Sequence, residues 1–386
     1  MNNFVYECPT KIIFGKDKEL EVGKIIKNYG SKVLIHYGGG SVIKSGLLDR
    51  VKKALDEEGI NYLELGGVKP NPRLSLVKKG IELVRKEGID FILAVGGGSV
   101  IDSSKAIGLS AVHDFDLWEI YLRKKEPQGH IPVGVILTIP AAGSEMSTSA
   151  VITNEETNEK RGYNTVFNRP AFSILNPELI YTVPKYHLSA GVCDMFVHII
   201  ERYFTNTKNV RVTDNLCLGL MKTIVEVGPK FINDITNYDY AAEIMWASSI
   251  AHNGLLDTGR VSDWASHNIE HALSAHYDIS HGGGLAVIVP NWMKYVYKHN
   301  LDIFVTYAHE VFNVEKVGTK EEIALKGIQK TSEFFASLGL PLTLKDYNID
   351  DSKFSQMAAA AAYFGPLGNF VPLSKEDIIN IYRSAL

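Results

Sequence analysis

Histidines are concentrated in one short segment of this chain, at a spacing that suits metal binding. Four of the twelve histidines fall within fifteen residues. His267 and His271 are four residues apart, so a helix would carry both side chains on one face, about one turn from each other. His281 follows a predicted bend at residues 277–280 and could fold back to the same point.

A second pair of possible ligands precedes this cluster by about seventy residues. Asp194 and His198 are also four apart in a predicted helix. Three imidazoles and one carboxylate form a set that Fe²⁺ or Zn²⁺ accepts, with a coordination position left for a substrate. A single pair with this spacing is usually a solvated helix face, so the metal hypothesis rests on both pairs together with His281. We interpret His252 and His276 as ordinary helix or loop histidines.

A glycine loop at residues 96–98, followed by Ser99, lies between a predicted buried strand and a predicted helix. This arrangement points backbone N–H groups and the helix dipole at a phosphate, and the missing Cβ atoms let a pyrophosphate approach. Ser99 and Asp102 also match a helix-capping pair. A plain tight turn is the alternative, because Ile101 replaces the third glycine of the usual dinucleotide fingerprint.

Two further loops suit a dinucleotide. Residues 38–40 are glycines that also follow a predicted strand, with Ser41 next. An acidic residue there commonly binds the ribose and repels a 2′-phosphate, so these small uncharged residues favour acceptance of either NADH or NADPH. Residues 138–145 end a later strand with small and hydroxylated side chains, which suits either a loop over the nicotinamide half or an ordinary polar loop.

The order of the predicted elements indicates two domains. Alternating strands and helices in the first half predict a parallel sheet with helices on both faces. Strands are expected at residues 11–14, 32–37, 61–65, 91–95 and 133–139, with helices at 47–58, 75–87 and 100–109. Long helical patterns then follow at residues 194–203, 215–227, 240–253, 262–274 and 321–338. We therefore predict an α/β domain at residues 1–182 and a helical domain at residues 183–386.

Composition excludes several classes of protein. The 386 residues are 45% hydrophobic, and 40 basic against 44 acidic residues give a net charge of −4. These values argue against a disordered chain and provide no basic surplus for nucleic acid or anionic lipid. The three cysteines are widely spaced, the amino terminus lacks a signal-peptide pattern, and no apolar run reaches membrane-span length. We predict a cytoplasmic protein.

Assembled in order, these segments resemble the iron-containing (group III) alcohol dehydrogenase family, in particular its NAD(P)H-dependent butanol dehydrogenase and aldehyde reductase branch. The resemblance covers nearly the whole chain. It rests on Gly96-Gly97-Gly98-Ser99-x-x-Asp102-x-x-Lys105, Gly143-Ser144-Glu145, Asp263-Trp264-Ala265-Ser266-His267 and His281-Gly282. It implies an N-terminal Rossmann-like domain and a C-terminal helical domain of the dehydroquinate synthase-like type, with the active site in the cleft between them.

The resemblance also implies roles for individual residues. The family's metal ligands match Asp194, His198, His267 and His281, with Fe²⁺ expected ahead of Zn²⁺, and His271 matches a histidine that lines the active site. Asp194 and His271 are thereby the expected catalytic residues. The family's NAD(P)(H) contacts match Gly39, Ser41, Asn71, Gly97, Gly98, Ser99, Asp102, Thr138, Ser147 and Lys160.

Details of the nicotinamide pocket are less well matched. Ala142 stands where many relatives carry threonine, which removes one expected hydrogen bond to the cofactor. Ser147 and Leu179 fall at positions where relatives vary.

The resemblance implies hydride transfer between NAD(P)(H) and a primary alcohol or aldehyde such as butanol or butyraldehyde. It also implies a homodimer, to which the N-terminal strand could contribute. Three alternatives remain at this point: a glycerol- or diol-dehydrogenase-like enzyme with zinc, a dehydroquinate-synthase-like lyase, and a silent nucleotide- or metal-binding protein. The lyase would need a pocket rich in lysine and arginine, and residues 196–204 and 264–274 offer little of that.

Overall fold

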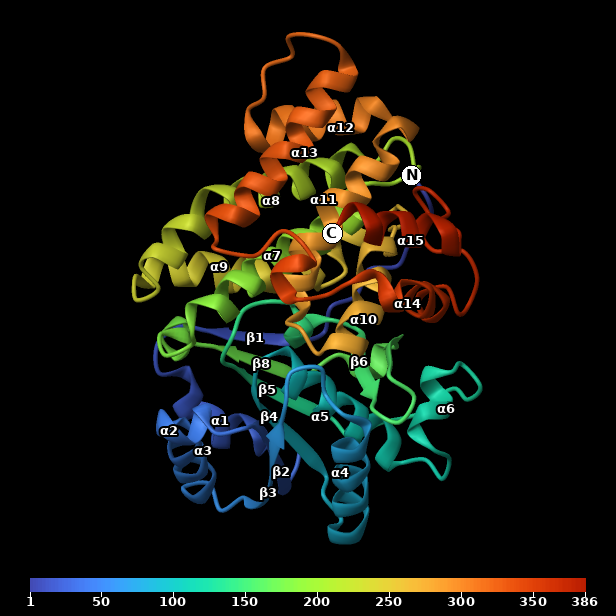
Figure 1. The fold of residues 1–386 in the computed structure, drawn as a ribbon. Helices are drawn as coiled ribbons and strands as arrows, with labels where there is room; N and C mark the ends of the chain where they lie inside the picture. The colour runs from blue at the N-terminus through green and yellow to red at the C-terminus, as the bar shows by residue number, and fades with distance from the viewer. The chain divides into compact units, whose positions relative to one another are not determined.

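The computed structural model describes residues 1–386, which form two compact units (Figure 1). Cys8–Val183 form an α/β unit, and Pro184–Leu386 form a helical unit together with Met1–Glu7. The first seven residues were expected in the α/β domain, and the structure assigns them to the helical unit instead. The reason is local bonding: the Met1 ammonium donates to the Lys208 carbonyl at 2.8 Å, and the Asn2 N–H donates to the Gly259 carbonyl at 2.8 Å.

The α/β unit is built on a parallel sheet of six strands in the order β1-β8-β5-β4-β2-β3. Its central strands β4 and β5 are buried at every position, as expected for a sheet covered on both faces. The strands are β1 (Lys11–Phe14), β2 (Lys32–Gly38), β3 (Asn61–Val68), β4 (Phe91–Gly96), β5 (Val133–Leu137) and β8 (Phe172–Leu175). The predicted strand and helix alternation of this half is therefore confirmed.

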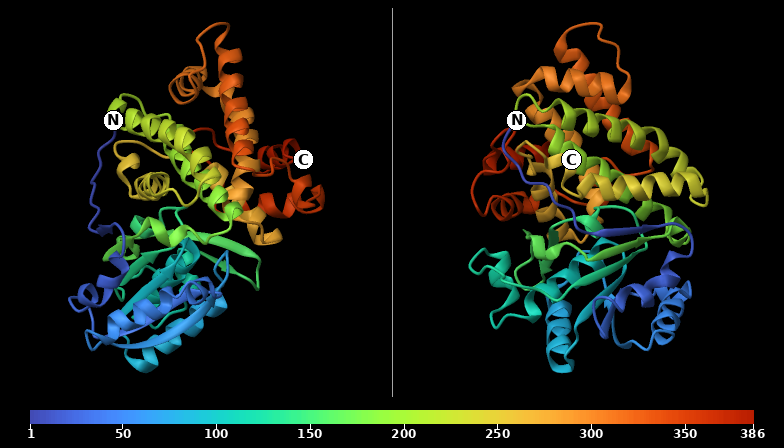
Figure 2. Two further views of the ribbon diagram at one scale, coloured as in Figure 1. Left: turned by 90° about the vertical axis from the view of Figure 1, so that its left-hand side faces the viewer. Right: turned by 180° about the vertical axis from the view of Figure 1, so that it is seen from behind.

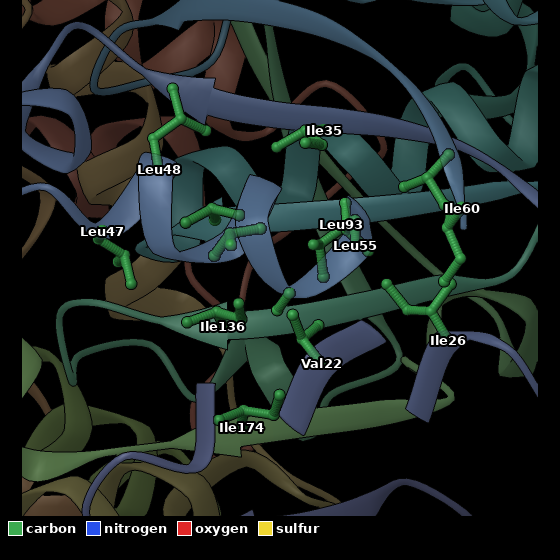
Figure 3. Close-up of a cluster of buried hydrophobic side chains, with 14 of the residues drawn as sticks. Val22, Ile26, Ile35, Leu47, Leu48, Leu55, Ile60, Leu93, Ile136 and Ile174 are labelled. Carbon is green, nitrogen blue, oxygen red and sulfur yellow. The ribbon is translucent and has the colours of Figure 1, made fainter. Parts of the chain in front are cut away.

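Helices cover both faces of this sheet. They are α1 (Val22–Ile26), α2 (Ser41–Lys44), α3 (Leu47–Asp56), α4 (Leu74–Glu87) and α5 (Gly98–Ala111), while the short helix α6 (Leu117–Tyr121) lies to the side and contacts strand β7 (Glu159–Asn164) of a separate hairpin. On one face, aliphatic side chains of α1 and α3 pack against alternate residues of the strands, because successive strand side chains point to opposite faces. Figure 3 shows this cluster, with Val22, Ile26 and Leu55 facing Ile35, Leu93, Ile136 and Ile174.

A separate antiparallel hairpin of β6 (Ser149–Asn154) and β7 (Glu159–Asn164) packs on α4 and α5. We did not predict this hairpin from the sequence. It covers α5 on the side away from the main sheet, and residues 103–110 of α5 are consequently buried all round.

The helical unit is organised around two buried helices, α7 (Lys185–Tyr203) and α11 (His281–Val296), which pack against each other. Nearly every residue of both is buried, so neither shows a solvent face. The other helices are α8 (Arg211–Asn233), α9 (Tyr238–His252), α10 (Ala265–Tyr277), α12 (Leu301–Phe312), α13 (Lys320–Ser337), α14 (Phe354–Ala361) and α15 (Lys375–Ser384). Figure 2 shows the N-terminal segment running along this unit toward the start of α8. No helix of the chain combines the length and apolar character needed to span a membrane.

Candidate metal centre and cofactor site

Three helices of the helical unit bring three histidines around one aspartate. Helix α7 carries Asp194 and His198, α10 carries His267, and α11 begins at His281 after a turn with Asp278 in the left-handed region. The Nε2 atoms of the three histidines lie 3.4, 3.7 and 3.7 Å from a single oxygen, Asp194 Oδ1. Adjacent corners of a tetrahedron with metal–ligand bonds of about 2.1 Å are about 3.4 Å apart, so the distances of the three Nε2 atoms from Asp194 Oδ1 suit a divalent metal. Ligand atoms of Asp194, His267 and His281 all lie within 4.8 Å of one another, a group that does not include His198.

Three of the four residues around this point carry buried polar atoms that make no hydrogen bond. Asp194 Oδ1, both ring nitrogens of His198, and His267 Nε2 are buried and make no hydrogen bond. Leaving such polar atoms unpaired costs free energy, whereas a cation held between them would satisfy most of them at once. Burial also lowers the pKa of His198 well below its usual value, which keeps the imidazole in the neutral form that binds metals. The residues present therefore fit a metal ion.

Buried glutamates orient two of the three histidines. Glu201 on α7 accepts a hydrogen bond from His267 Nδ1 at 3.0 Å, and Glu270 on α10 pairs with His281 Nδ1. Both carboxylates are fully buried. A histidine that donates its Nδ1 proton presents its Nε2 lone pair toward a metal, so each glutamate is placed to orient a candidate ligand on another helix. The position of Glu270 also explains why residue 284 is a glycine, because a Cβ at Gly284 would lie 2.6 Å from Glu270 Oε1.

His198 is oriented by packing instead. Its ring lies 4.1 Å from the His252 ring and 4.4 Å from the His267 ring, measured between centroids, and its edge meets Trp264. We had interpreted His252 as an ordinary histidine, but the structure places it against a candidate ligand. Its position at the last residue of α9 gave no periodic signal in the sequence.

His271 lies one helical turn beyond His267 and is only partly buried. Its ring centroid is 5.3 Å from the His281 ring and 6.3 Å from the His267 ring. It therefore lies beside the cluster and is partly exposed, and a possible ligand atom of His271 lies within 4.8 Å of one on Glu270 and one on His281.

The cofactor residues predicted in the α/β unit gather at the carboxyl edge of its sheet. From β2 the chain moves outward to β3, and from β4 it moves the opposite way to β5. Ligands of open α/β sheets bind at such a change of direction, beyond the carboxyl ends of the strands. The loops after β2 and β4 carry Gly39, Ser41 and residues 97–99, and the Thr138 N–H after β5 donates to the Gly96 carbonyl at 3.1 Å.

The glycine loop leaves the start of α5 open. The helix begins at Gly98, with no side chain capping its N–H groups. A Cβ at Gly97 would lie 2.0 Å from Ile139 Cγ2, so this position requires glycine for packing alone. A Cβ at Gly98 would have its nearest neighbour at 3.9 Å, on Ala142, so Gly98 has no such packing reason. Free N–H groups at a helix start favour a bound phosphate.

The predicted capping pair was wrong. Gly97 occupies the cap position, and both oxygens of Asp102 are used elsewhere: Ser144 Oγ donates to one at 2.6 Å, and the Val151 N–H donates to the other at 2.9 Å. Asp102 thus organises the protein around the glycine loop. Ser147 is similar, being almost fully buried within a network of protein hydrogen bonds.

Lys105, which the motif contained but to which we assigned no role, is the centre of that network. Its buried Nζ donates to the Ser144 and Ser149 carbonyls at 2.7 and 2.8 Å and contacts Ser147 as well. Burial lowers its pKa to about 8 although Asp102 opposes the shift. Nearby, Lys160 Nζ donates to Asn71 Oδ1 at 2.9 Å, so these two predicted cofactor residues are in direct contact.

A glycine loop at the switch point of a parallel sheet and a buried histidine–carboxylate centre are together typical of metal-dependent dinucleotide oxidoreductases. Comparison with known proteins agrees. Residues 9–177 match the iron-containing alcohol dehydrogenase family, and residues 188–386 match the Fe-containing alcohol dehydrogenase family, C-terminal. The chain belongs to the iron-containing alcohol dehydrogenase family.

Individual relatives cover the whole chain. It is 46% identical over 387 residues to "Probable NADH-dependent butanol dehydrogenase 1" of Bacillus subtilis, with 100% of each chain covered. It is 38% identical over 355 residues to NADPH-dependent aldehyde reductase YqhD of Escherichia coli, with 91% of each covered. The crystal structure of NADH-dependent butanol dehydrogenase A from Thermotoga maritima superposes with a TM-score of 0.96 at 38% identity, covering 100% of this chain and 99% of that one. The predicted family, branch and fold class are confirmed, and the diol-dehydrogenase, lyase and silent-binder alternatives are not supported.

Proposed function

We propose that this chain is a metal-dependent alcohol dehydrogenase and aldehyde reductase that transfers hydride between NAD(P)(H) and a primary alcohol or aldehyde such as butanol or butyraldehyde. The observation that carries the proposal is the convergence of three imidazole Nε2 atoms on Asp194 Oδ1. The names of the butanol dehydrogenase and aldehyde reductase relatives support the substrate class.

In this proposal the metal is held by Asp194, His198, His267 and His281, and Fe²⁺ is the expected occupant ahead of Zn²⁺. The ligand set accepts either metal, and membership of an iron-containing family favours iron. Two more buried carboxyl groups contact the ligands, Glu201 at His267 and Glu270 at His281. A dication offsets this buried negative charge.

The overall reaction is RCHO + NAD(P)H + H⁺ giving RCH₂OH + NAD(P)⁺. When bound, the metal supplies Lewis acidity toward the substrate oxygen and the nicotinamide supplies or accepts the hydride. Asp194 offsets part of the metal charge and fixes the arrangement of the three imidazoles. The partly buried His271 passes the proton between an imidazole nitrogen and solvent.

The dinucleotide is held by backbone and by a few polar side chains. Residues 97–99 bind the pyrophosphate at the start of α5, and Asn71 with Lys160 binds toward the ribose and nicotinamide. Because Gly39 and Ser41 are uncharged, either NADH or NADPH is accepted. The remaining predicted contacts are Thr138, which lies beside the glycine loop, and Asp102 and Ser147, which hydrogen-bond to the protein around that loop.

We also propose a cytoplasmic homodimer. Strand β1 pairs with β8 alone and so offers a free edge to a second copy. Sedimentation of the purified chain tests the dimer, and cell fractionation tests the compartment.

The decisive experiment is anaerobic purification followed by elemental analysis, and assay after reconstitution of the metal-free protein with Fe²⁺ or Zn²⁺. We expect one metal per chain and oxidation of NADH or NADPH that depends on butyraldehyde. Reduction of glycerone in preference to butyraldehyde, or turnover by metal-free protein, contradicts the proposal.

A further inference from the structure

Glu201 occupies an unusual position in the helical unit. It lies seven residues after Asp194 and three after His198, on the same face of α7, and its side chain is fully buried. Moving a carboxylate out of water is costly unless several hydrogen bonds compensate. The partners of Glu201 therefore indicate what the buried charge does.

All of these partners come from one segment, the turn that leads into α10. Glu201 Oε1 accepts hydrogen bonds from Ser266 Oγ at 2.6 Å, from the His267 backbone N–H at 2.9 Å, and from His267 Nδ1 at 3.0 Å. Glu201 Oε2 accepts from the Trp264 N–H at 2.7 Å, and the Glu201 carbonyl accepts from the Asp263 N–H at 2.7 Å. One residue of α7 thus holds the whole start of α10.

The backbone of that turn requires stabilising contacts, because Trp264 lies in the left-handed region with φ of 67°. A bulky residue is rarely found there, and such a conformation persists only when its surroundings impose it. Arg202, next to Glu201, also contacts Trp264: its guanidinium lies 4.7 Å from the centre of the Trp264 ring. Arg202 also donates to the His198 carbonyl at 2.7 Å.

Four donors therefore meet the two carboxylate oxygens of Glu201. A carboxylate accepts from all of them without offering a proton of its own, which is what this turn requires.

We propose that Glu201 is the positioning residue of the metal centre, setting both the place and the tautomer of His267. It fixes the turn from which His267 projects, and it takes the Nδ1 proton so that Nε2 is presented to the metal. The inference rests on the proposed function, since it assigns a role toward the same metal. In this role Glu201 acts through His267 and is not itself a ligand of the metal.

Glu201→Gln tests this. A glutamine keeps the shape, but its amide nitrogen would face the Trp264 N–H, donor against donor, and its oxygen is a weaker acceptor for His267. We expect the Kd for Zn²⁺, measured by competition with a chromophoric chelator, to rise about 10–100-fold. At full occupancy with Co²⁺, the visible absorption spectrum should differ from that of the wild type, because the ligand geometry is altered.

Glu19→Gln is the matched control. Glu19 is also a buried carboxylate, at 2% exposure, but it lies in the α/β unit and accepts from Asn176 and Arg50. Glu19→Gln should lower thermal stability and leave the Zn²⁺ Kd and the Co²⁺ spectrum unchanged. Equal weakening of Zn²⁺ binding in both variants, or unchanged binding in Glu201→Gln, overturns the proposal.

A measurement on the wild type covers the case in which Glu201→Gln does not fold. Nitrogen-15 NMR of the Zn²⁺-loaded protein with labelled histidine should show His267 protonated at Nδ1, and assignment of its signal to a protonated Nε2 overturns the proposal. If the wild type binds no divalent metal at all, the proposed function fails, a result distinct from failure of the role of Glu201.

Discussion

The candidate metal centre and the glycine loop proposed to bind phosphate are built in opposite ways. In the helical unit, the candidate ligands Asp194, His198 and His267 are buried and His281 is partly buried, and two of the three histidines contact a carboxylate from another helix. In the α/β unit, the start of α5 offers backbone N–H groups from residues that have no side chain, or a small one. The first region therefore depends on which side chains are present, and the second on side chains being absent.

Two buried histidines show the same difference in electrostatic terms. His36 on β2 contacts the Leu65 carbonyl at 2.6 Å and Ser103 Oγ at 2.8 Å, and burial lowers its pKa to about 4. For His267, burial also acts to lower the pKa, but Asp194 and Glu201 raise it to about 9. His36 is thus a neutral histidine that serves the packing of the α/β unit. His267, in the helical unit, lies among negative charges that suit a cation.

The largest expected effect comes from removing a ligand. His267→Ala should abolish metal retention and lower turnover by more than about 100-fold, because even residues behind the ligands contribute 10–100-fold. Metal content and aldehyde reduction measure the two effects. Normal metal content and activity in His267→Ala would show that the helical unit does not depend on its ligand side chains, and the contrast with the glycine loop would fail.

The next effect concerns acid stability of the α/β unit. The unfolded chain protonates His36 near its ordinary pKa of 6.5, while the folded chain does so only near 4, so stability falls as pH decreases from 6.5 toward 4. Between pH 7 and pH 5 the loss is about 2 kcal/mol. The His36→Gln variant should not show this loss of stability between pH 7 and pH 5.

Denaturant unfolding of metal-free protein at both pH values measures this difference. The metal-free state is chosen so that metal release does not contribute. An equal acid-induced loss in wild type and His36→Gln would show that His36 is not the responsible group.

The smallest expected effect is on the glycine loop. Gly98→Val should raise the apparent KM for the dinucleotide about 10-fold, or about 1.4 kcal/mol, with metal content unchanged. A Cβ fits at this position within the protein, so the added side chain meets the cofactor first. Gly97→Val is the contrasting variant, since its Cβ would overlap Ile139 and should lower stability. Unaltered dinucleotide binding in Gly98→Val would place the pyrophosphate elsewhere.

The sequence predicted those features that local patterns encode. Buried strands such as β4 and β5 are continuous apolar runs, and the glycine loop stands out between a strand and a helix. The pairs Asp194–His198 and His267–His271 follow helical spacing, which identified α7 and α10 as the helices that carry them.

Long-range contacts were beyond such patterns. Glu201 and Glu270 look like ordinary helical glutamates until their partners on other helices are known, although the spacing of Asp194, His198 and Glu201 at positions i, i+4 and i+7 was available as a signal. Lys105 and Asp102 were assigned to a motif, but their contacts with residues 144–151 arise only when the chain folds back over α5.

The path of the chain has a mechanical consequence. Because Met1–Glu7 belong to the helical unit and Cys8–Val183 do not, the chain passes from one unit to the other twice. A single cut after Val183 would therefore leave the helical unit assembled from both fragments, with residues 1–7 as a tether. We expect the nicked protein to elute as one species under native conditions, and to separate more readily when residues 1–7 are deleted.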